Sequence, residues 1–506
     1  MIASPLRIPP ATLRTASRRR VLLALSVVLA IALPLSCATE PPPAPATAEP
    51  ATTVTPPAGP PPGKLEPPPF PTGAAPMTRE KADDARTANR RAIFDAAWTL
   101  VRDKHYDKKL GGVNWTAARA RYEPLALAAP SESSFYRTLN QMIGELGQSH
   151  MMVTGPGAED EDNEGTEALA PSTDESTPQQ PPMKLAAGVG DPGLTVRVIE
   201  NRPTITAVKP GSSAEKHGLA PGFIVTQIGG REIRSTSDSH RPLRPVEERF
   251  AIRRLAQARL MGQAGTRVTL RYLDNEDRPG EVLLTRDETR TSAVTLGHLP
   301  PLYPQVKIEQ IHDVGLLSFN IFLLQPVLED IKRAVAGFRA RNTRALILDL
   351  RGNPGGQGAM AIPVAAQFID HPLTLGTLQF REFTNTLVAR PELGSTPFTG
   401  PLVILTDEGT ASAAEMLAAG LQEAKRAIVV GDATLGAVLP SMVVALPGGA
   451  VMQYVVADFK TPKGVLLEGR GVQPDRRVVE TRASLKTGHD PVLDAALVAI
   501  RASRTK

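Results

Sequence analysis

The sequence predicts a multidomain α/β (α+β) protein, in which a helical block precedes a β-rich block and a larger core of alternating strands and helices. Three observations support this fold class. Apolar residues recur at helical spacing over residues 79–153, short apolar strands bounded by glycine and proline fill residues 186–290, and strands alternate with amphipathic helices over residues 291–506. A chain of 506 residues is long enough for several such domains.

The N-terminus has the pattern of an export signal. Three arginines, Arg18 to Arg20, precede an apolar run from Val21 to Leu33, which is shorter than the roughly 20 residues that a membrane-spanning helix needs. We therefore expect residues 1–36 to be a signal peptide, and a membrane-anchoring helix is the alternative. The arginine cluster fits both Sec and twin-arginine signals, so the export route stays open.

Cys37 follows this run, directly after Ser36. A small residue before a cysteine at this place resembles the lipidation box of bacterial lipoproteins. Cys37 is the only cysteine, so the chain cannot form an internal disulfide. We expect lipidation at Cys37 and a lipid-anchored location in the bacterial cell envelope, at the outer membrane and facing the periplasm. A periplasmic or secreted protein is the alternative.

Two segments have compositions that disfavour packing. Residues 37–78 consist largely of proline, alanine and threonine, and we expect them to form an extended tether. Residues 154–185 contain five acidic residues between positions 159 and 164, and we expect a solvated, flexible loop. The acidic spacing does not match the calcium-binding loop of an EF-hand, so no metal site is predicted.

The charge balance argues against a nucleic-acid partner. The formal charge of +5 comes from 57 basic and 52 acidic residues, and residues 1–36 contain five arginines and no acidic residue. Without that segment, 57 less five leaves 52 basic residues, which balance the 52 acidic ones. The mature chain therefore lacks the basic excess that nucleic-acid-binding proteins carry.

The β-rich block contains an ordered set of turns. Val208 to Ser212, then Gly218-Leu219, then Pro221-Gly222 resemble a protease-associated PDZ domain over residues 186–290. The resemblance implies that a peptide binds as an added β-strand and that backbone N–H groups hold its terminal carboxylate. Gly188-Val189-Gly190 is the candidate carboxylate-binding loop. A PDZ-like spacer that binds no ligand is the alternative.

In the core, the glycine-rich turn Asp349 to Gly356 follows a buried strand. Glycines let backbone N–H groups face a ligand, and a strand-to-helix turn of this kind can hold a developing oxyanion. A phosphate-binding loop would carry a Lys-Ser or Lys-Thr pair, which this turn lacks.

Ser412 lies in a second strand-to-helix turn, Glu408 to Glu415. By itself, a serine at such a place is more often a helix cap than a nucleophile. The two turns together, however, resemble peptidase family S41, which comprises the C-terminal-processing (tail-specific) proteases and the tricorn core. The resemblance spans about residues 85–480 and includes four parts of the helical block: Trp98, Tyr106-Asp107, Gly112 to Trp115 and Leu146 to His150.

The resemblance implies a crotonase-like α/β peptidase core and a site for acyl transfer. Ser412 matches the family's nucleophile, and the N–H of Ala413, with that of Gly355 or Gly356, matches its oxyanion hole. The implied substrates are polypeptides, which the PDZ-like domain would hold by the C-terminus. The resemblance implies no metal ion and no organic cofactor.

The sequence departs from the family at the general base. C-terminal-processing proteases carry a lysine in a Thr-Phe-Gly-Lys-like turn, but the matching run here, Thr434 to Ala437, ends in an alanine that cannot accept a proton. The tricorn branch uses a histidine preceded by a serine, together with a glutamate. Ser149-His150 matches this pair, and Glu468 matches the glutamate ahead of a Gly-Val-x-Pro-Asp run.

We therefore expect an exported serine endopeptidase with a Ser-His-Glu relay. A histidine suits the role of base because its ordinary pKa of about 6.5 allows proton exchange near neutrality. The missing lysine favours the alternative, a catalytically inactive, envelope-anchored PDZ protein that only binds peptides.

Overall fold

The computed structural model describes residues 79–156, 188–234, 242–288, 294 and 302–504. The predicted signal peptide, Cys37, the tether and nearly all of the acidic loop lie outside these residues. The described residues belong to one compact unit, Pro76–Lys506. In this part of the chain, no helix has the length and apolar character needed to cross a membrane.

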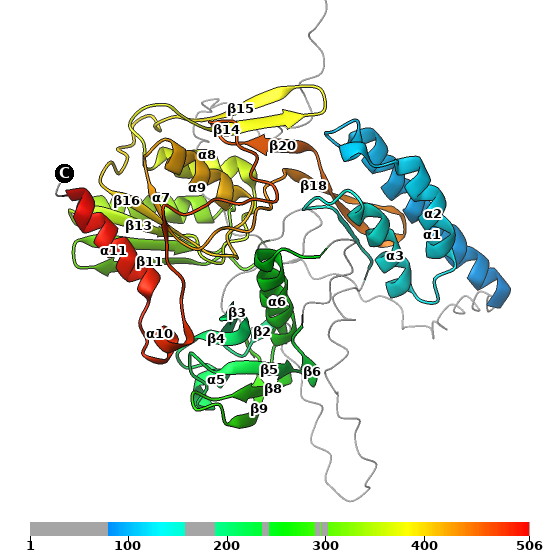
Figure 1. Ribbon diagram of the computed structural model, residues 1–506, viewed down its shortest axis with the longest axis horizontal. Coiled ribbons are helices and arrows are strands. Elements are labelled where there is room, and N and C mark those ends of the chain that lie inside the picture. The colour runs from blue at the N-terminus through cyan, green and yellow to red at the C-terminus, as the bar shows by residue number, and fades with distance from the viewer. Residues whose placement is uncertain (1–78, 157–187, 235–241, 289–293, 295–301, 505–506) are drawn as a thin grey trace, which may run out of the picture. The chain divides into compact units, whose positions relative to one another are not determined.

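Three helices open the described chain: α1 (Arg79–Lys104), α2 (Trp115–Leu127) and α3 (Glu132–Gly144) (Figure 1). The side chains of Asn114 and Ser131 begin α2 and α3, because each accepts a hydrogen bond from the N–H three residues further on. The helices bury Phe94, Phe135 and Leu139 together with side chains from a small sheet. That sheet has the order β1 (Met152–Thr154), β19 (Val451–Val455) and β18 (Ser441–Ala445).

The β-rich segment, residues 188–288, contains two sheets. The larger has the order β3-β4-β5-β8-β9, with β6 paired to β5, and the smaller has the order β10-β2-β7. β3 is therefore an edge strand, whereas β2 has a strand on each side. The bounds are β2 (Val189–Asp191), β3 (Leu194–Ile199), β4 (Arg202–Val208), β5 (Ile224–Ile228), β6 (Arg231–Glu232), β7 (Gly262–Gln263), β8 (Arg267–Leu273), β9 (Pro279–Thr285) and β10 (Asp287–Glu288).

A long helix in this segment, α6 (Pro245–Leu260), is not predicted by the sequence. The only helix expected there is short, and the structure has it as α5 (Ser213–Lys216), which begins after Ser212. α6 carries several arginines and buries only Ala256 and Leu260, so it lacks a clear apolar stripe. It contacts β3 and extends toward the loops of the core (Figure 1).

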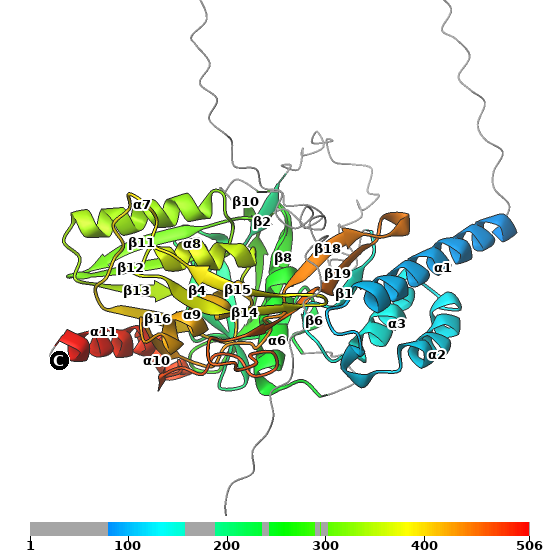
Figure 2. The ribbon, with the colours of Figure 1, turned by 90° about the horizontal axis from the view of Figure 1, so that it is seen from above.

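The core is a six-stranded sheet of order β11-β12-β13-β16-β17-β21, parallel from β12 onward. Apolar side chains of α7, α8 and α9 cover one face of this sheet, and those of α11 cover the other. Figure 2 shows helices α7 and α11 on opposite sides of the strands. This layered arrangement confirms the predicted α/β multidomain class.

The strands are β11 (Val306–Ile311), β12 (Val314–Phe319), β13 (Ala345–Asp349), β16 (Leu402–Thr406), β17 (Ile428–Gly431) and β21 (Arg476–Arg477). The helices are α7 (Val327–Ala340), α8 (Ala361–Ala366), α9 (Ala413–Glu423), α10 (Arg482–Lys486) and α11 (Pro491–Arg504).

A further three-stranded sheet lies beside α9. Its order is β15 (Thr384–Ala389), β14 (Leu373–Phe380) and β20 (Ala457–Lys460). The chain continues from β20 into the turn that carries Glu468.

Candidate active site

The glycine-rich turn and the turn that carries Ser412 begin at the ends of neighbouring parallel strands. β13 ends at Asp349 and leads to Gly355, and β16 ends at Thr406 and leads to Ser412. Because the carboxyl ends of parallel strands lie at one edge of the sheet, the loops meet there. The approach is close, since a Cβ on Gly355 would lie 2.6 Å from Ser412 Cβ and 2.9 Å from the Ala413 nitrogen.

Ser412 does not have the geometry of an ordinary cap. Its φ of 55° and ψ of −123° lie outside the regions that a serine usually occupies, and its hydroxyl makes no capping hydrogen bond. Ser131, in contrast, has the extended conformation and side-chain hydrogen bond of a normal cap. The Ser412 N–H is held by the Ala437 carbonyl at 2.9 Å and by Glu415 Oε2 at 3.0 Å. The strained turn leaves the hydroxyl unused, as a nucleophile requires.

Of the two candidate glycines, Gly356 has the freer N–H. The Gly355 N–H donates to Asn353 Oδ1 at 2.9 Å. Within the described residues, neither the Gly356 N–H nor the Ala413 N–H has an acceptor. Gly356 also needs to be glycine, because its φ is 137° and a Cβ there would lie 2.4 Å from the Phe322 carbonyl oxygen. The unpaired donors are therefore those of Gly356 and Ala413.

The histidine, serine and glutamate predicted for the relay lie together. Ser149 Oγ donates to Glu468 Oε2 at 3.1 Å and lies 2.8 Å from His150 Nδ1. Glu468 Oε1 also accepts the Ser149 N–H at 2.8 Å. Because the Ser149 hydroxyl donates to the carboxylate, it accepts from His150, which places the imidazole proton on Nδ1 and leaves Nε2 as the basic nitrogen.

A short stretch of backbone joins this relay to Ser412. The Val438 N–H donates to Glu468 Oε2 at 3.0 Å, and the carbonyl of the preceding residue, Ala437, accepts the Ser412 N–H. The structure therefore brings Ser412, Ser149, His150 and Glu468 into one hydrogen-bonded assembly. No hydrogen bond joins the Ser412 hydroxyl to His150 in the described residues, and such bonds often tighten only when substrate is bound.

The surroundings of His150 favour its neutral form. Burial, and then the positive charge of Arg254, lower the pKa of His150 to about 4. Its backbone lies in the left-handed region, with a φ of 58°, so the chain is strained at His150 as well as at Ser412. Burial also raises the pKa of Glu468. The hydrogen bonds from Ser149 and Val438 lower this pKa, but they offset the effect of burial only in part.

Glu415 is a buried residue beside Ser412 whose contacts the sequence did not predict. Its carboxylate is fully buried and accepts four hydrogen bonds, from the Thr434 hydroxyl and from the N–H groups of Gly436, Ala437 and Ser412. Burial raises its pKa to about 7, although these donors favour the ionised form. Glu415 thus fixes the backbone of Ser412 relative to the turn that ends at Ala437. The only sequence signal is its place three residues after Ser412, as in a capping box.

Ala437, at the position that matches the family lysine, belongs to an apolar cluster. Ala437 packs with Ala411 and Leu435, and Val246 and Phe250 of α6 lie against this cluster. Arg244, at the start of α6, also donates to the Leu435 carbonyl at 2.9 Å. Helix α6 therefore packs directly on the turn that ends at Ala437.

A second histidine, His105, is fully buried and supports the Ser149-His150 turn. His105 Nε2 lies 2.6 Å from Gln148 Oε1, and its Nδ1 lies 3.1 Å from the Asp107 N–H. The carboxamide oxygen can only accept, so His105 carries its proton on Nε2 and holds Gln148 from the helical block. The sequence singles out the adjacent Tyr106-Asp107 but not His105.

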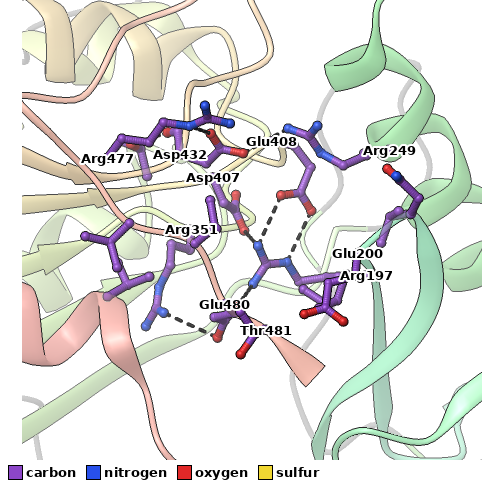
Figure 3. Close-up of a pocket in the computed structure, with 17 residues that line it drawn as sticks. Arg197, Glu200, Arg249, Arg351, Asp407, Glu408, Asp432, Arg477, Glu480 and Thr481 are labelled. Atoms are coloured by element: carbon purple, nitrogen blue, oxygen red, sulfur yellow. Dashed lines mark hydrogen bonds and ion pairs between the residues drawn. The ribbon is translucent and has the colours of Figure 1, made fainter. Parts of the chain in front are cut away.

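An ion-pair cluster joins the β-rich segment to the core next to the nucleophile loop. Figure 3 shows Arg197 of β3 between Glu408, Asp407 and Glu480. Asp407 Oδ1 in turn accepts the Gly352 N–H at 2.7 Å, within the glycine-rich turn. A cavity of about 210 Å³ opens beside this cluster, and none of the candidate catalytic residues lines it. Among the described residues, no group of acidic, histidine or cysteine side chains has the arrangement of a metal site.

The candidate carboxylate-binding loop lies apart from these contacts. Val189 and Gly190 belong to β2, which pairs with β7 on one side and β10 on the other. The Gly188 carbonyl accepts the Ala264 N–H at 2.9 Å. The backbone of this segment is thus largely engaged in sheet pairing.

Comparisons with known proteins show which families this chain is similar to. Residues 313–478 match Peptidase family S41, and residues 86–144 match the tricorn protease C1 domain. Carboxyl-terminal-processing proteases of Picosynechococcus sp. and Synechocystis sp. are each 27% identical to this chain, over 76% of it and over 81% and 79% of their own lengths.

Two solved structures share the fold. The photosystem II D1 C-terminal processing protease has a TM-score of 0.50 and 21% identity, and covers 77% of this chain and 93% of its own. Mature CPAF has a TM-score of 0.53 and 16% identity. The match covers 79% of this chain and 94% of the CPAF chain. Fold and matches together define a serine-type peptidase. Residues 313–478 are therefore a peptidase family S41 domain, as the sequence motifs predict.

Proposed function

We propose that the protein is an endopeptidase that cleaves polypeptides at Ser412, with His150 as general base and Ser149 and Glu468 as its relay. The observation that carries this proposal is the hydrogen-bonded order Glu468, Ser149, His150, with the Nε2 of His150 left free. This relay supplies the base that Ala437 cannot provide.

In the proposed mechanism, His150 Nε2 takes the proton of the Ser412 hydroxyl as Oγ attacks the peptide carbonyl. The carbonyl oxygen becomes an oxyanion, for which the N–H groups of Gly356 and Ala413 are the available donors. The imidazolium is stabilised through Ser149 by Glu468 and then protonates the leaving amine. Water, deprotonated by His150, hydrolyses the acyl-enzyme and restores Ser412.

Substrate capture by a PDZ-like domain is part of the proposal. Among the described residues, no strand pairs with one edge of β3, and α6 lies against β3, so a peptide strand could add between the two. Gly188-Val189-Gly190 stays the proposed terminus-binding loop, although β2 is paired on both sides. Export and lipidation at Cys37 also remain proposals, as does a site of action in the bacterial envelope.

The experiment is hydrolysis of an unfolded polypeptide, such as casein, by the full-length protein and by Ser412→Ala. We expect the wild-type protein to produce peptide fragments and Ser412→Ala to produce none. A wild-type protein that binds peptides but cleaves none would support the inactive peptide-binding alternative, which the alanine at position 437 favours.

A further inference from the structure

A cationic side chain, Arg254, lies on α6, the helix that packs on the turn carrying Ser412 and reaches that turn through Arg253. Val246 and Phe250 pack on the apolar cluster that includes Ala437. Residues four apart lie on one face of a helix, so Arg254 continues the stripe of these two residues by one further turn. Arg254 is exposed, so its side chain lies in open space rather than in the contact with the core.

Arg254 also differs from its neighbours on α6 in having no partner. Arg249 pairs with Asp432 at 2.9 Å, and Arg253 pairs with Asp407 at 3.0 Å. In the described parts of the chain, Arg254 makes neither an ion pair nor a hydrogen bond. Because Arg253, the preceding residue, reaches Asp407 and Glu408 in the Ser412 turn, Arg254 lies at the same level of α6, and its charge lowers the pKa of His150.

A free guanidinium near the base is unfavourable for the chemistry proposed above. Transfer of the serine proton places a positive charge on His150, and the charge of Arg254 opposes it. A negative group on a bound substrate would pair with Arg254 and offset this repulsion. Proton transfer to His150 is therefore more favourable when the substrate supplies a negatively charged group that pairs with Arg254.

We propose that Arg254 binds a carboxylate of the peptide substrate close to the scissile bond and so determines specificity for acidic peptides or chain ends. The planar guanidinium offers paired N–H donors that match the two oxygens of a carboxylate. The carboxylate belongs either to an aspartate or glutamate side chain or to the C-terminus of the substrate. This inference rests on the proposed function and names the substrate class of the same site.

The test uses short peptides and the full-length protein. A single glutamate is moved along an otherwise neutral sequence, each peptide is compared with its glutamine counterpart, and one further pair differs only in a free or amidated C-terminus. At the preferred position, we expect kcat/KM to be about tenfold higher for the carboxylate, the size of a typical charge-assisted hydrogen bond. The position with the largest ratio distinguishes a side chain from a chain end.

Three variants connect this preference to Arg254. Arg254→Gln is expected to bring the ratio close to one, and Arg254→Glu to favour the corresponding lysine peptides. Arg267→Gln is the matched control, because it removes an exposed arginine of β8 and should leave the preference unchanged.

Two outcomes would overturn the inference, and they differ. If the wild-type protein cleaves every pair equally, or if Arg254→Gln keeps the full preference, Arg254 does not select the substrate and the proposed function stands. If no peptide is cleaved and a fluorophosphonate does not label Ser412, the proposed function fails and the inference fails with it. Binding of the same peptides to Ser412→Ala should show the same tenfold preference without turnover, and the double variant Ser412→Ala/Arg254→Gln should lose it.

Discussion

At the scale of single residues, the basicity of His150 sets the pH range of the proposed peptidase. Burial and the charge of Arg254 lower the pKa of His150 to about 4. A general base acts only in its unprotonated form, so a lowered pKa extends activity to lower pH. We expect kcat/KM to change little between about pH 7 and 5 and to fall as the pH passes about 4. A fall centred near the ordinary histidine pKa of about 6.5 would contradict the described surroundings of His150.

The sequence predicts the catalytic candidates better than the residues that hold them. Ser412, Ser149-His150 and Glu468 stand in recognisable motifs, and the structure brings them together. Their catalytic roles remain predictions. Glu415 and His105 act through long-range hydrogen bonds, and no local pattern of residue types reveals such partners. The strained φ of Ser412 is equally invisible, since serine normally avoids that conformation.

At the scale of elements, the glycine-rich turn must approach the nucleophile turn closely. Gly355 has a φ of 91°, and a Cβ there would collide with Ser412 Cβ. We expect Gly355→Ala to lower kcat by at least about 100-fold, because it displaces Ser412 and the Ala413 N–H. Gly358→Ala is the control, since a Cβ at Gly358 meets nothing within 4 Å. Peptide hydrolysis by the two variants measures the difference, and equal activity would show that the close approach is unimportant.

Glu415 joins two elements, the start of α9 and the turn before Val438. Glu415→Gln keeps the size of the side chain but turns one of its acceptor oxygens into a donor, which then faces a donor such as the Gly436 N–H. We expect a loss of about 1–3 kcal/mol in the free energy of unfolding, measured by urea denaturation, together with lower activity. Unchanged stability and activity of Glu415→Gln would show that Glu415 does not support the site.

The elements of the core are better predicted than α6. Buried strands and amphipathic helices such as α7 follow apolar periodicity, which the sequence displays directly. Helix α6 instead docks through arginines such as Arg244 and Arg253 and through two apolar side chains, those of Val246 and Phe250. Its contacts depend on acidic residues and carbonyl groups that lie far away in the sequence, so periodicity does not predict it.

At the scale of the whole molecule, Arg197 connects the β-rich segment to the core. Burial raises the pKa of Asp407, but Arg197 and Arg253 more than offset this and hold it well below its usual range. The depressed pKa means that this stabilisation is present above about pH 4, the unfolded value, and is lost as the pH falls toward the lower folded value.

Replacing Arg197 should therefore lower the stability of the protein strongly at neutral pH. Arg197→Met leaves Glu408, Asp407 and Glu480 without their shared cation, so we expect a loss of about 3–5 kcal/mol in the free energy of unfolding. Arg271→Met removes an arginine from an exposed pair with Glu281 and should have little effect. Denaturant unfolding of both variants at pH 7 measures the contrast, and equal losses would contradict the role of the buried cluster.

The central claim is that a histidine relay activates Ser412 in place of the missing lysine. The most direct measurement is the rate at which a fluorophosphonate labels Ser412 in the wild-type protein, His150→Ala and Ala437→Lys, with the labelled residue identified by mass spectrometry. The account predicts labelling of Ser412 in the wild-type protein, loss of labelling by several orders of magnitude in His150→Ala, and no gain in Ala437→Lys. Labelling of His150→Ala at the wild-type rate, or no labelling of wild-type Ser412, would contradict it.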